Sequence, residues 1–180
     1  IRQFVVTLKK WGKATYIGFN SIEFDEEFLR CTLFQTLEYP YITSTNGNTR
    51  GDVLSLARAA NLYYPKTLQN SVNDKGNDVY KLDQMAPLNG IEHGDAHSAI
   101  GDVIATVGIA KIIANKAPNV WKASMLTMDK NQSLDLIQKE LFFCTNEYFY
   151  GRSRPYVQTF VCQHPQYQWP LCYDLKHDPG

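Results

Sequence analysis

The first 116 residues show the apolar spacing of helices, interrupted by one short stretch that has the character of a strand. Residues 15–19 are mostly β-branched or aromatic, which is typical of a buried strand. One strand among several helices indicates an α/β layer fold whose sheet lies mostly outside this chain. The pattern predicts helices at 1–11, 22–37 (capped by Asn20 or Ser21), 52–62, 81–88 and 99–114, with polar loops at 43–51 and 65–78.

The pattern changes after residue 116. Residues 117–141 predict a connector with short helices. From residue 142, strand-like pieces alternate with Gly, Pro and polar turns, as at the start of a β domain. We therefore expect three segments: part of an α/β domain at 1–116, a helical connector at 117–141, and the start of a β-rich second domain at 142–180.

Composition adds few constraints. The chain is 44% hydrophobic and 20% charged, as in ordinary globular proteins, and no apolar run approaches the ~20 residues that span a bilayer. Basic and acidic residues number 18 each, so the net charge is zero. A neutral balance argues mildly against a partner rich in phosphates, but an enzyme that combines acidic metal ligands with basic contacts can also reach it.

The cysteines carry little functional signal. They form no C-x-x-C pair, and a zinc site shared with His164 and His177 would have unusual spacing. We interpret them as reduced thiols in the core, and the compartment as reducing and cytoplasmic. The four are Cys31, Cys144, Cys162 and Cys172.

An acidic residue falls within the apolar face of the predicted helix 22–37. On a helical wheel Asp25 lies inside the apolar arc, whereas Glu26 and Arg30 form an i,i+4 pair on the polar side. Burying an unpaired carboxylate is costly, so we expect Asp25 to have a cation or metal partner. The alternative is a helix that is rotated or interrupted there. The arc consists of Ile22, Phe24, Phe28, Leu29, Cys31 and Leu33.

The helix at 99–114 contains a second such acid. It is apolar nearly all round, which predicts a buried helix, and Asp102 is its one acid. His97 stands five residues earlier, at the helix entrance, where a group that titrates near neutral pH could act as a general base. The alternative is a histidine that only caps or packs. His93 and His97 also have a zinc-type spacing, but Gly94 stands where the zinc protease pattern needs Glu.

Two isolated acids and a histidine fit phosphoryl chemistry that depends on divalent metals. Two Mg²⁺ or Mn²⁺ ions ~4 Å apart can hold a phosphodiester, activate a water and stabilise the leaving oxygen. Oxygen ligands favour these ions over metals that prefer sulfur. Asp25 and Asp102 are the candidate ligands.

Two motifs resemble those of the DEDD exonuclease superfamily. Residues 18–25, GFNSIEFD, resemble the second motif, in which an Asn and an Asp follow a strand. Residues 97–102, HSAIGD, resemble the third motif in its histidine-containing form. The stretches around and between them, together with the connector and β-rich region that follow, resemble the bacterial exodeoxyribonuclease I family, with a similarity that thins after about Trp121. These stretches are FDEE at 24–27, YPY at 39–41, GNTR at 47–50, DVL at 52–54 and NGIEH at 89–93.

The resemblance implies a fold, an activity and roles for residues. The fold would be an RNase H-like α/β exonuclease domain followed by a small β barrel. The activity would be 3′→5′ hydrolysis of single-stranded DNA to mononucleotides, as in DNA repair. Asp25 and Asp102 would be metal ligands for two Mg²⁺ or Mn²⁺ ions, and His97 the general base. The expected partners are single-stranded DNA and, as a candidate, single-stranded DNA-binding protein, with the enzyme a cytoplasmic monomer away from membranes.

The first motif of that superfamily, an Asp-x-Glu pair on a strand, has no counterpart before Asp25. Residues 25–27 spell Asp-x-Glu, but they lie on a predicted helix with Glu27 on its polar side. We therefore expect the natural protein to be longer at both ends, and this chain alone to be inactive. Without the missing strands, the apolar faces around Phe28 and Ile104 should be uncovered, which predicts poor stability or aggregation.

Contacts to DNA are predicted in two places. Asn20 belongs to the second motif, and the polar loop with Asn48, Thr49 and Arg50 ends on a basic residue. A solvated turn is an equally simple interpretation of that loop. Aromatic and basic residues also alternate in the β region, at Tyr148, Tyr150, Arg152 and Arg154, and could touch a strand of DNA.

Two alternatives stay open. One is a different branch of the same superfamily, such as a proofreading subunit or an RNA-directed exonuclease, which the β-rich second domain disfavours. The other is a non-catalytic protein that binds nucleic acid or acts as a scaffold on a nuclease-like fold. The residues Asp25, His97 and Asp102 argue against a scaffold, and the absent first motif argues for it.

Overall fold

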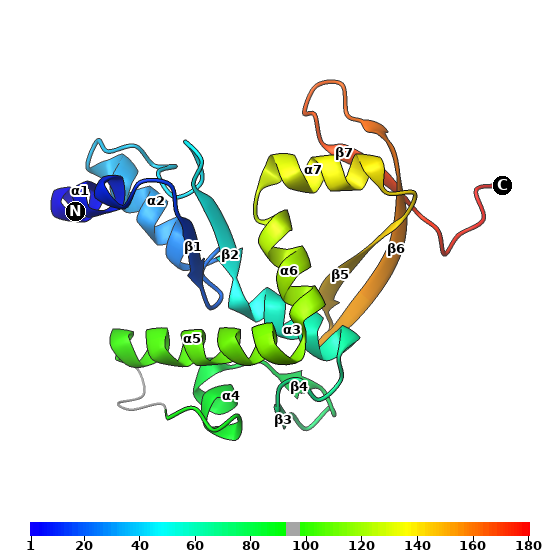
Figure 1. Cartoon of the computed structure of the whole chain (residues 1–180), viewed down its shortest axis with the longest axis horizontal. Helices are drawn as coiled ribbons and strands as arrows, with labels where there is room; N and C mark the ends of the chain where they lie inside the picture. Colours follow the sequence, from blue (N-terminus) through cyan, green and yellow to red (C-terminus); the bar gives the residue numbers. More distant parts are fainter. Residues whose placement is uncertain (93–97) are drawn as a thin grey trace.

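The computed structural model describes residues 1–92 and 98–180 of the chain (Figure 1). It is a mixed α/β structure with three small sheets. The helices are α1 (Arg2–Trp11), α2 (Asp25–Gln35), α3 (Val53–Tyr63), α4 (Leu82–Leu88), α5 (Ala99–Lys116), α6 (Pro118–Thr127) and α7 (Lys130–Lys139). The strands are β1 (Thr15–Gly18), β2 (Thr49–Asp52), β3 (Ser71–Val72), β4 (Asp78–Val79), β5 (Phe143–Phe149), β6 (Arg152–Gln163) and β7 (Pro170–Asp174).

Strands β1 and β2 form a parallel pair, and α2 provides the crossover between them. The register places Thr15 opposite Thr49 and Gly18 opposite Asp52, so both strands end at the same edge. The prediction of β1 is confirmed, whereas the loop predicted at 43–51 is wrong at its end, where β2 begins. Residues 49–52 have little intrinsic strand character, and their pairing with β1 decides their conformation.

Helix α2 begins at Asp25, three residues later than predicted. Its N-cap residue is Phe24, which makes no side-chain cap, so the expected capping by Asn20 or Ser21 is wrong. Asn20 instead has a positive φ of 58° and turns the chain after β1. Residues 19–24 are therefore a turn between strand and helix, closed by a hydrogen bond from the Glu26 N–H to the Ser21 carbonyl oxygen (2.9 Å).

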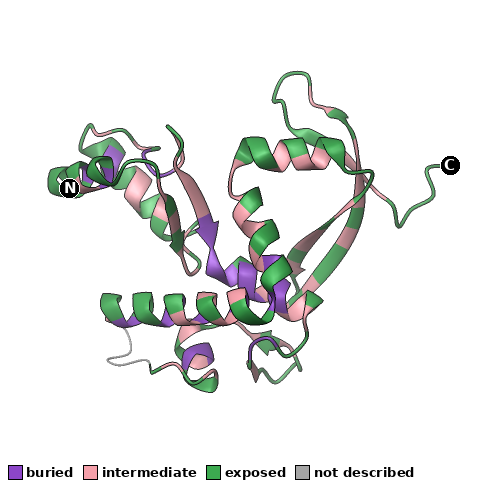
Figure 2. Ribbon diagram, in the orientation of Figure 1, coloured by how far each residue is buried: buried purple, intermediate pink, exposed green. Residues whose placement is uncertain are grey.

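The main core surrounds α3. This helix buries Val53, Leu56, Ala57 and Ala60 and packs against α5 and α6. Figure 2 shows the burial concentrated where β2 passes into α3. A second, smaller core joins α1 to α2, and its members are Val5, Leu8, Leu33 and Ile42.

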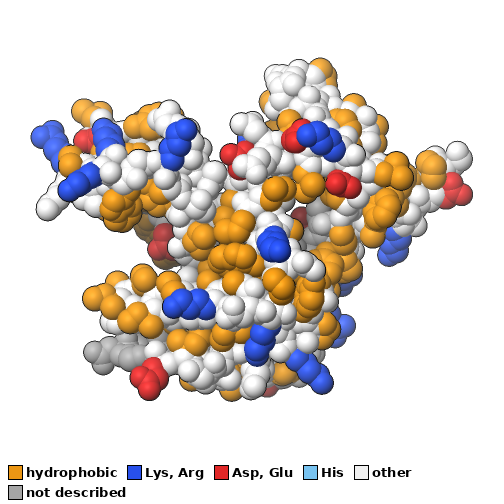
Figure 3. Space-filling model, viewed as in Figure 1, with side chains coloured by type: hydrophobic (Ala, Val, Ile, Leu, Met, Phe, Trp, Pro, Cys, Tyr) orange, Lys and Arg blue, Asp and Glu red, His pale blue; other side chains and the backbone are white. Residues whose placement is uncertain are grey.

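Helix α5 is buried on one face only, which corrects the prediction of a helix buried all round. Ile109 and Ile113 lie fully inside the main core, whereas Ile100 is 75% exposed and Ile104 is 55% exposed. On α2, Phe28 is 63% exposed. The uncovered apolar faces expected around Phe28 and Ile104 are thus confirmed. Figure 3 shows hydrophobic side chains gathered along α5 and on the α1–α2 part above it.

Strands β5, β6 and β7 form an antiparallel sheet in that order, which confirms a β-rich region after residue 142. The first of these strands is continuous, because every residue of β5 pairs with β6. The pairing of β6 with β7 shifts between Phe160 and Cys162.

Aromatic and polar side chains join this sheet to the α/β part. The Arg58 guanidinium lies 3.8 Å from the centre of the Tyr148 ring, and Tyr80 meets the same ring edge-on. The Arg152 Nε donates to the Asn77 side chain (3.1 Å). Burial, with a smaller contribution from Asp78, raises the pKa of Tyr80 to about 12. Tyr148 and Arg152 therefore hold the two parts of the chain together.

The cysteines are mostly at the surface. None of the four forms a disulfide, but Cys31, Cys144 and Cys162 are exposed, so the prediction of core thiols is wrong for these three. In the part of the chain that the structure describes, no helix has the length and apolar character needed to cross a bilayer.

The half-buried character of α5 gives a test of the main core. Ile109→Ala should lower the free energy of unfolding by about 2–5 kcal/mol, because it leaves a cavity against α3. Ile100→Ala on the same helix should change it by less than about 0.5 kcal/mol, because that side chain is exposed. Urea unfolding followed by circular dichroism measures both, and equal effects would contradict the placement of α5.

Candidate active site

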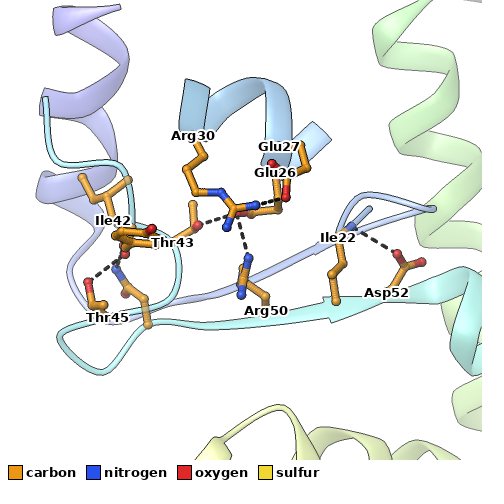
Figure 4. A network of polar contacts seen from close by, with 11 residues as sticks. Ile22, Glu26, Glu27, Arg30, Ile42, Thr43, Thr45, Arg50 and Asp52 are labelled. Carbon is orange, nitrogen blue, oxygen red and sulfur yellow. Dashed lines mark hydrogen bonds and ion pairs between the residues drawn. The ribbon is translucent and has the colours of Figure 1, made fainter. Parts of the chain in front are cut away.

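The carboxyl edge of the β1–β2 pair is organised by Asp52. This residue is buried (8% exposed) and directly precedes α3. Its Oδ1 accepts hydrogen bonds from the backbone N–H of Leu54 (2.9 Å) and of Asn20 (2.8 Å), and its Oδ2 accepts from the N–H of Ile22 (3.3 Å) (Figure 4). One carboxylate thus caps α3 and holds the turn after β1. The carboxyl edge of parallel strands is also where open α/β folds usually bind ligands.

A polar network from β2 reaches the first turn of α2. The Glu26 carboxylate is largely buried, and its Oε2 accepts from the Thr43 hydroxyl (2.6 Å) and lies 3.5 Å from the Arg50 guanidinium (Figure 4). The predicted Glu26–Arg30 pair is wrong, because Arg30 pairs with Glu27. Glu26 points toward β2, where Arg50 lies, and toward Thr43 in the segment before it.

Asp25 is the first residue of α2 and is exposed, which corrects its predicted burial. Its neighbours on the wheel are Phe28 and Leu29. Phe28 is 63% exposed, whereas Leu29 is partly buried against the smaller core. The face that carries Asp25 is therefore only partly covered by the described residues. A carboxylate in the first turn of a helix is favoured by the helix dipole and can still bind a cation from solvent.

Asp102 occupies the same kind of position on α5. It lies in the first turn, one residue after Gly101, whose N–H donates to the Ser98 side chain in an N-cap (3.0 Å). Asp102 is exposed, so its predicted burial is wrong for the same reason as that of Asp25. Both candidate ligands thus stand in the first turns of separate helices: Asp25 on α2 and Asp102 on α5. In Figure 1, α5 lies below α2.

His97, the candidate general base, and His93 lie outside the described residues. The described residues contain no group of three or more His, Cys, Asp or Glu side chains placed to hold a metal ion. The donors that the site does offer, the carboxylate oxygens of Asp25 and Asp102, suit Mg²⁺ or Mn²⁺ by their chemistry.

The residues predicted to contact DNA have structural partners. The Asn48 side chain accepts from the Ala14 N–H (2.9 Å) and donates to the Ile42 carbonyl (2.6 Å), which fixes the entrance to β2. The Thr49 hydroxyl lies 2.8 Å from that of Thr15 on the neighbouring strand. The polar loop expected here is therefore held in place, with Thr49 and Arg50 inside β2.

Asp52 is a residue of the site that the sequence pattern does not predict. The pattern makes it the first residue of a helix, whereas it is the last residue of β2 and the N-cap of α3, which begins at Val53. A signal for this role is present in the sequence, because Asp52 follows Gly51 and directly precedes an apolar helix. Its bonds to Asn20 and Ile22 depend on residues 30 or more positions away, which no local pattern reveals.

Comparison with known proteins gives a consistent result. No protein-family model matches the chain. It is 36% identical to exodeoxyribonuclease I of Haemophilus influenzae over 107 residues, which are 59% of this chain and 23% of that protein. It is 31% identical to exodeoxyribonuclease I of Escherichia coli K12 over 126 residues, or 69% of this chain and 26% of that protein. The chain thus spans about a quarter of the length of these relatives.

Solved structures show the same likeness in fold. The structure of E. coli exonuclease I with a dA16 oligonucleotide superposes with a TM-score of 0.79 and 24% identity, covering 98% of this chain and 40% of that one. A complex of ExoI with SSB-Ct matches with a TM-score of 0.72 and 24% identity, covering 90% and 36% respectively. The chain is therefore similar in sequence and in fold to part of exodeoxyribonuclease I, in agreement with the resemblance of its motifs.

The close approach of the turn to β1 gives a test. A Cβ added at Gly18 would lie 2.5 Å from the Ser21 Cβ and 2.7 Å from its Oγ. Gly18→Ala should therefore lower the free energy of unfolding by about 1–3 kcal/mol through overpacking. Adding Ser21→Gly removes both obstructing atoms and should restore most of the loss. Urea unfolding of the two single variants and the double variant measures this coupling, and strictly additive effects would contradict the contact.

Proposed function

We propose, from the likeness of this chain to part of exodeoxyribonuclease I, that the protein containing it hydrolyses single-stranded DNA from the 3′ end and releases mononucleotides. The observation that carries the proposal is the pair of exposed carboxylates, Asp25 and Asp102, each in the first turn of a helix. Asp25 follows the carboxyl edge of the β1–β2 pair, where ligands of α/β folds usually bind.

In this proposal each residue has a distinct role. Asp25 and Asp102 hold two Mg²⁺ or Mn²⁺ ions, which supply charge stabilisation and an activated water when bound. His97 accepts the proton of the attacking water as its oxygen bonds to phosphorus. The bond between phosphorus and the 3′ oxygen breaks, and that oxygen leaves with its electron pair and is protonated by solvent.

Contacts to the DNA strand are proposed for Asn20, Asn48, Thr49 and Arg50. The structure supports this unequally. Asn20 is exposed at the carboxyl edge of β1, beside the turn that leads to Asp25. Arg50 lies 3.5 Å from Glu26, so part of its charge is already neutralised within the protein. We therefore rank Asn20 above Arg50 as a contact.

We further propose the organisation of the longer protein. Residues 1–116 would belong to the exonuclease domain, 117–141 to a connector and 142–180 to a second, barrel-like domain. Additional strands of the exonuclease sheet would cover the apolar faces around Phe28 and Ile104. The protein would act as a cytoplasmic monomer in DNA repair, with single-stranded DNA-binding protein as a partner. Two carboxylate ligands are few for this chemistry, so we expect the 180-residue chain alone to be inactive.

The proposal is tested with the full-length protein and single-stranded DNA labelled at the 5′ or the 3′ end. Stepwise shortening from the 3′ end should require Mg²⁺ and stop with a chelator. Asp25→Ala and Asp102→Ala should each lower the rate by at least about a hundredfold, because a lost metal ligand removes several kcal/mol of transition-state stabilisation.

Asp83→Ala is the matched control, since Asp83 is likewise an exposed acid in the first turn of a helix, α4. It should keep the parent rate. Tight DNA binding without cleavage would instead indicate a non-catalytic scaffold. Preferred cleavage of RNA would indicate another branch of the superfamily.

A further inference from the structure

Helix α2 has no anchor of its own at the end that carries Asp25. Phe24, the N-cap residue, offers no side-chain cap, and its ring is 58% exposed. The one fully buried residue of the helix is Leu33, more than two turns further along. Packing therefore fixes the far end of α2, and other contacts must fix the position of Asp25.

Asp52 supplies such contacts from a rigid part of the molecule. It is continuous with α3, whose residues Val53 and Ala57 are fully buried in the main core. From there its carboxylate holds the N–H groups of Asn20 and Ile22, five and three residues before Asp25. The Asp52 side chain thus fixes the turn that precedes Asp25 relative to the core helix α3.

A second tie reaches α2 just beyond Asp25, also from β2 and the segment before it. Glu26 accepts from the Thr43 hydroxyl at 2.6 Å and lies 3.5 Å from Arg50. Along the chain, Asp25 therefore stands between two polar anchors: Asp52 holds the turn before it, and the Arg50–Glu26 pair holds the residue after it. Figure 4 shows both anchors. Of the two, Asp52 is the more buried, and two of its bonds go to the backbone of the turn itself.

We infer that Asp52 is a positioning residue that sets the place of the metal ligand Asp25 through the Asn20–Phe24 turn. The inference rests on the proposed function, because it takes Asp25 to be a ligand. Asp52 binds neither metal nor substrate in this role. Its effect is to limit how far the Asp25 carboxylate moves relative to the α3 core.

Asp52→Asn tests the inference because it removes one specific bond. The Asn Oδ1 can still accept from Leu54 and Asn20, whereas its NH₂ group would face the Ile22 N–H, donor against donor. The loss leaves the α3 cap in place and loosens the turn. Asp52→Ser is the second variant, in case Asp52→Asn does not fold, because serine also caps helices but is too short to hold the turn.

Asp129→Asn is the matched control. Asp129 caps α7 through the N–H groups of Asn131 and Gln132 and has no bond to the turn before Asp25 among the described contacts. In the full-length protein, the Mn²⁺ dissociation constant is measured from the spin resonance signal of free Mn²⁺, and the melting temperature by circular dichroism. Asp52→Asn should weaken Mn²⁺ binding about tenfold, as supporting residues of metal ligands typically do, and Asp129→Asn less than about twofold.

The outcomes separate the inference from the function on which it rests. Weaker Mn²⁺ binding in Asp52→Asn, measured at a temperature at which circular dichroism shows both it and Asp129→Asn to be folded, supports positioning. Unchanged binding in Asp52→Asn, with binding lost in Asp25→Ala, overturns the inference and leaves the proposed function intact. Unchanged binding in Asp25→Ala overturns both, because Asp25 would then not be a ligand.

Discussion

Three backbone N–H groups meet at the carboxyl edge of the β1–β2 pair, and the Asp52 carboxylate accepts a hydrogen bond from each. An unpaired buried N–H costs about 1–3 kcal/mol, and the Leu54 N–H is such a buried group, whereas the bonds to Asn20 and Ile22 are part-buried. The same contacts join the end of β1 to the start of α3, which lies in the main core. The path of the chain from β1 through the turn to Asp25 depends on this one side chain.

The two candidate ligands show that an acid on the apolar face of a helix can be exposed. Asp25 and Asp102 are gathered with apolar neighbours on their helices, yet both are exposed, and so are Phe28 and Ile104. Desolvation therefore does not mark them as ligands in this chain. What they share is an exposed position in the first turn of a helix, where the helix dipole favours a carboxylate.

The similarity to exodeoxyribonuclease I and the contacts around Asp52 give different information about this chain. The likeness covers most of this chain but about a quarter of the relatives' length. The geometry adds what a likeness does not give, namely that β2 anchors the turn before Asp25 through Asp52 and the helix after it through Glu26. Arg50, a proposed DNA contact, also takes part in that anchoring.

Several features can be predicted from the sequence: the helices α3, α4 and α5, the strand β1, the β-rich region after residue 142 and the two motifs that carry Asp25, His97 and Asp102. Local spacing and caps encode these features, as the Asp52 cap of α3 does. Long-range packing, in contrast, makes residues 49–52 a strand, starts α2 at Asp25, and covers some faces of α2 and α5 but not others. Each of these depends on partners distant in the sequence, and a periodic pattern shows which residues are apolar but not what packs against them.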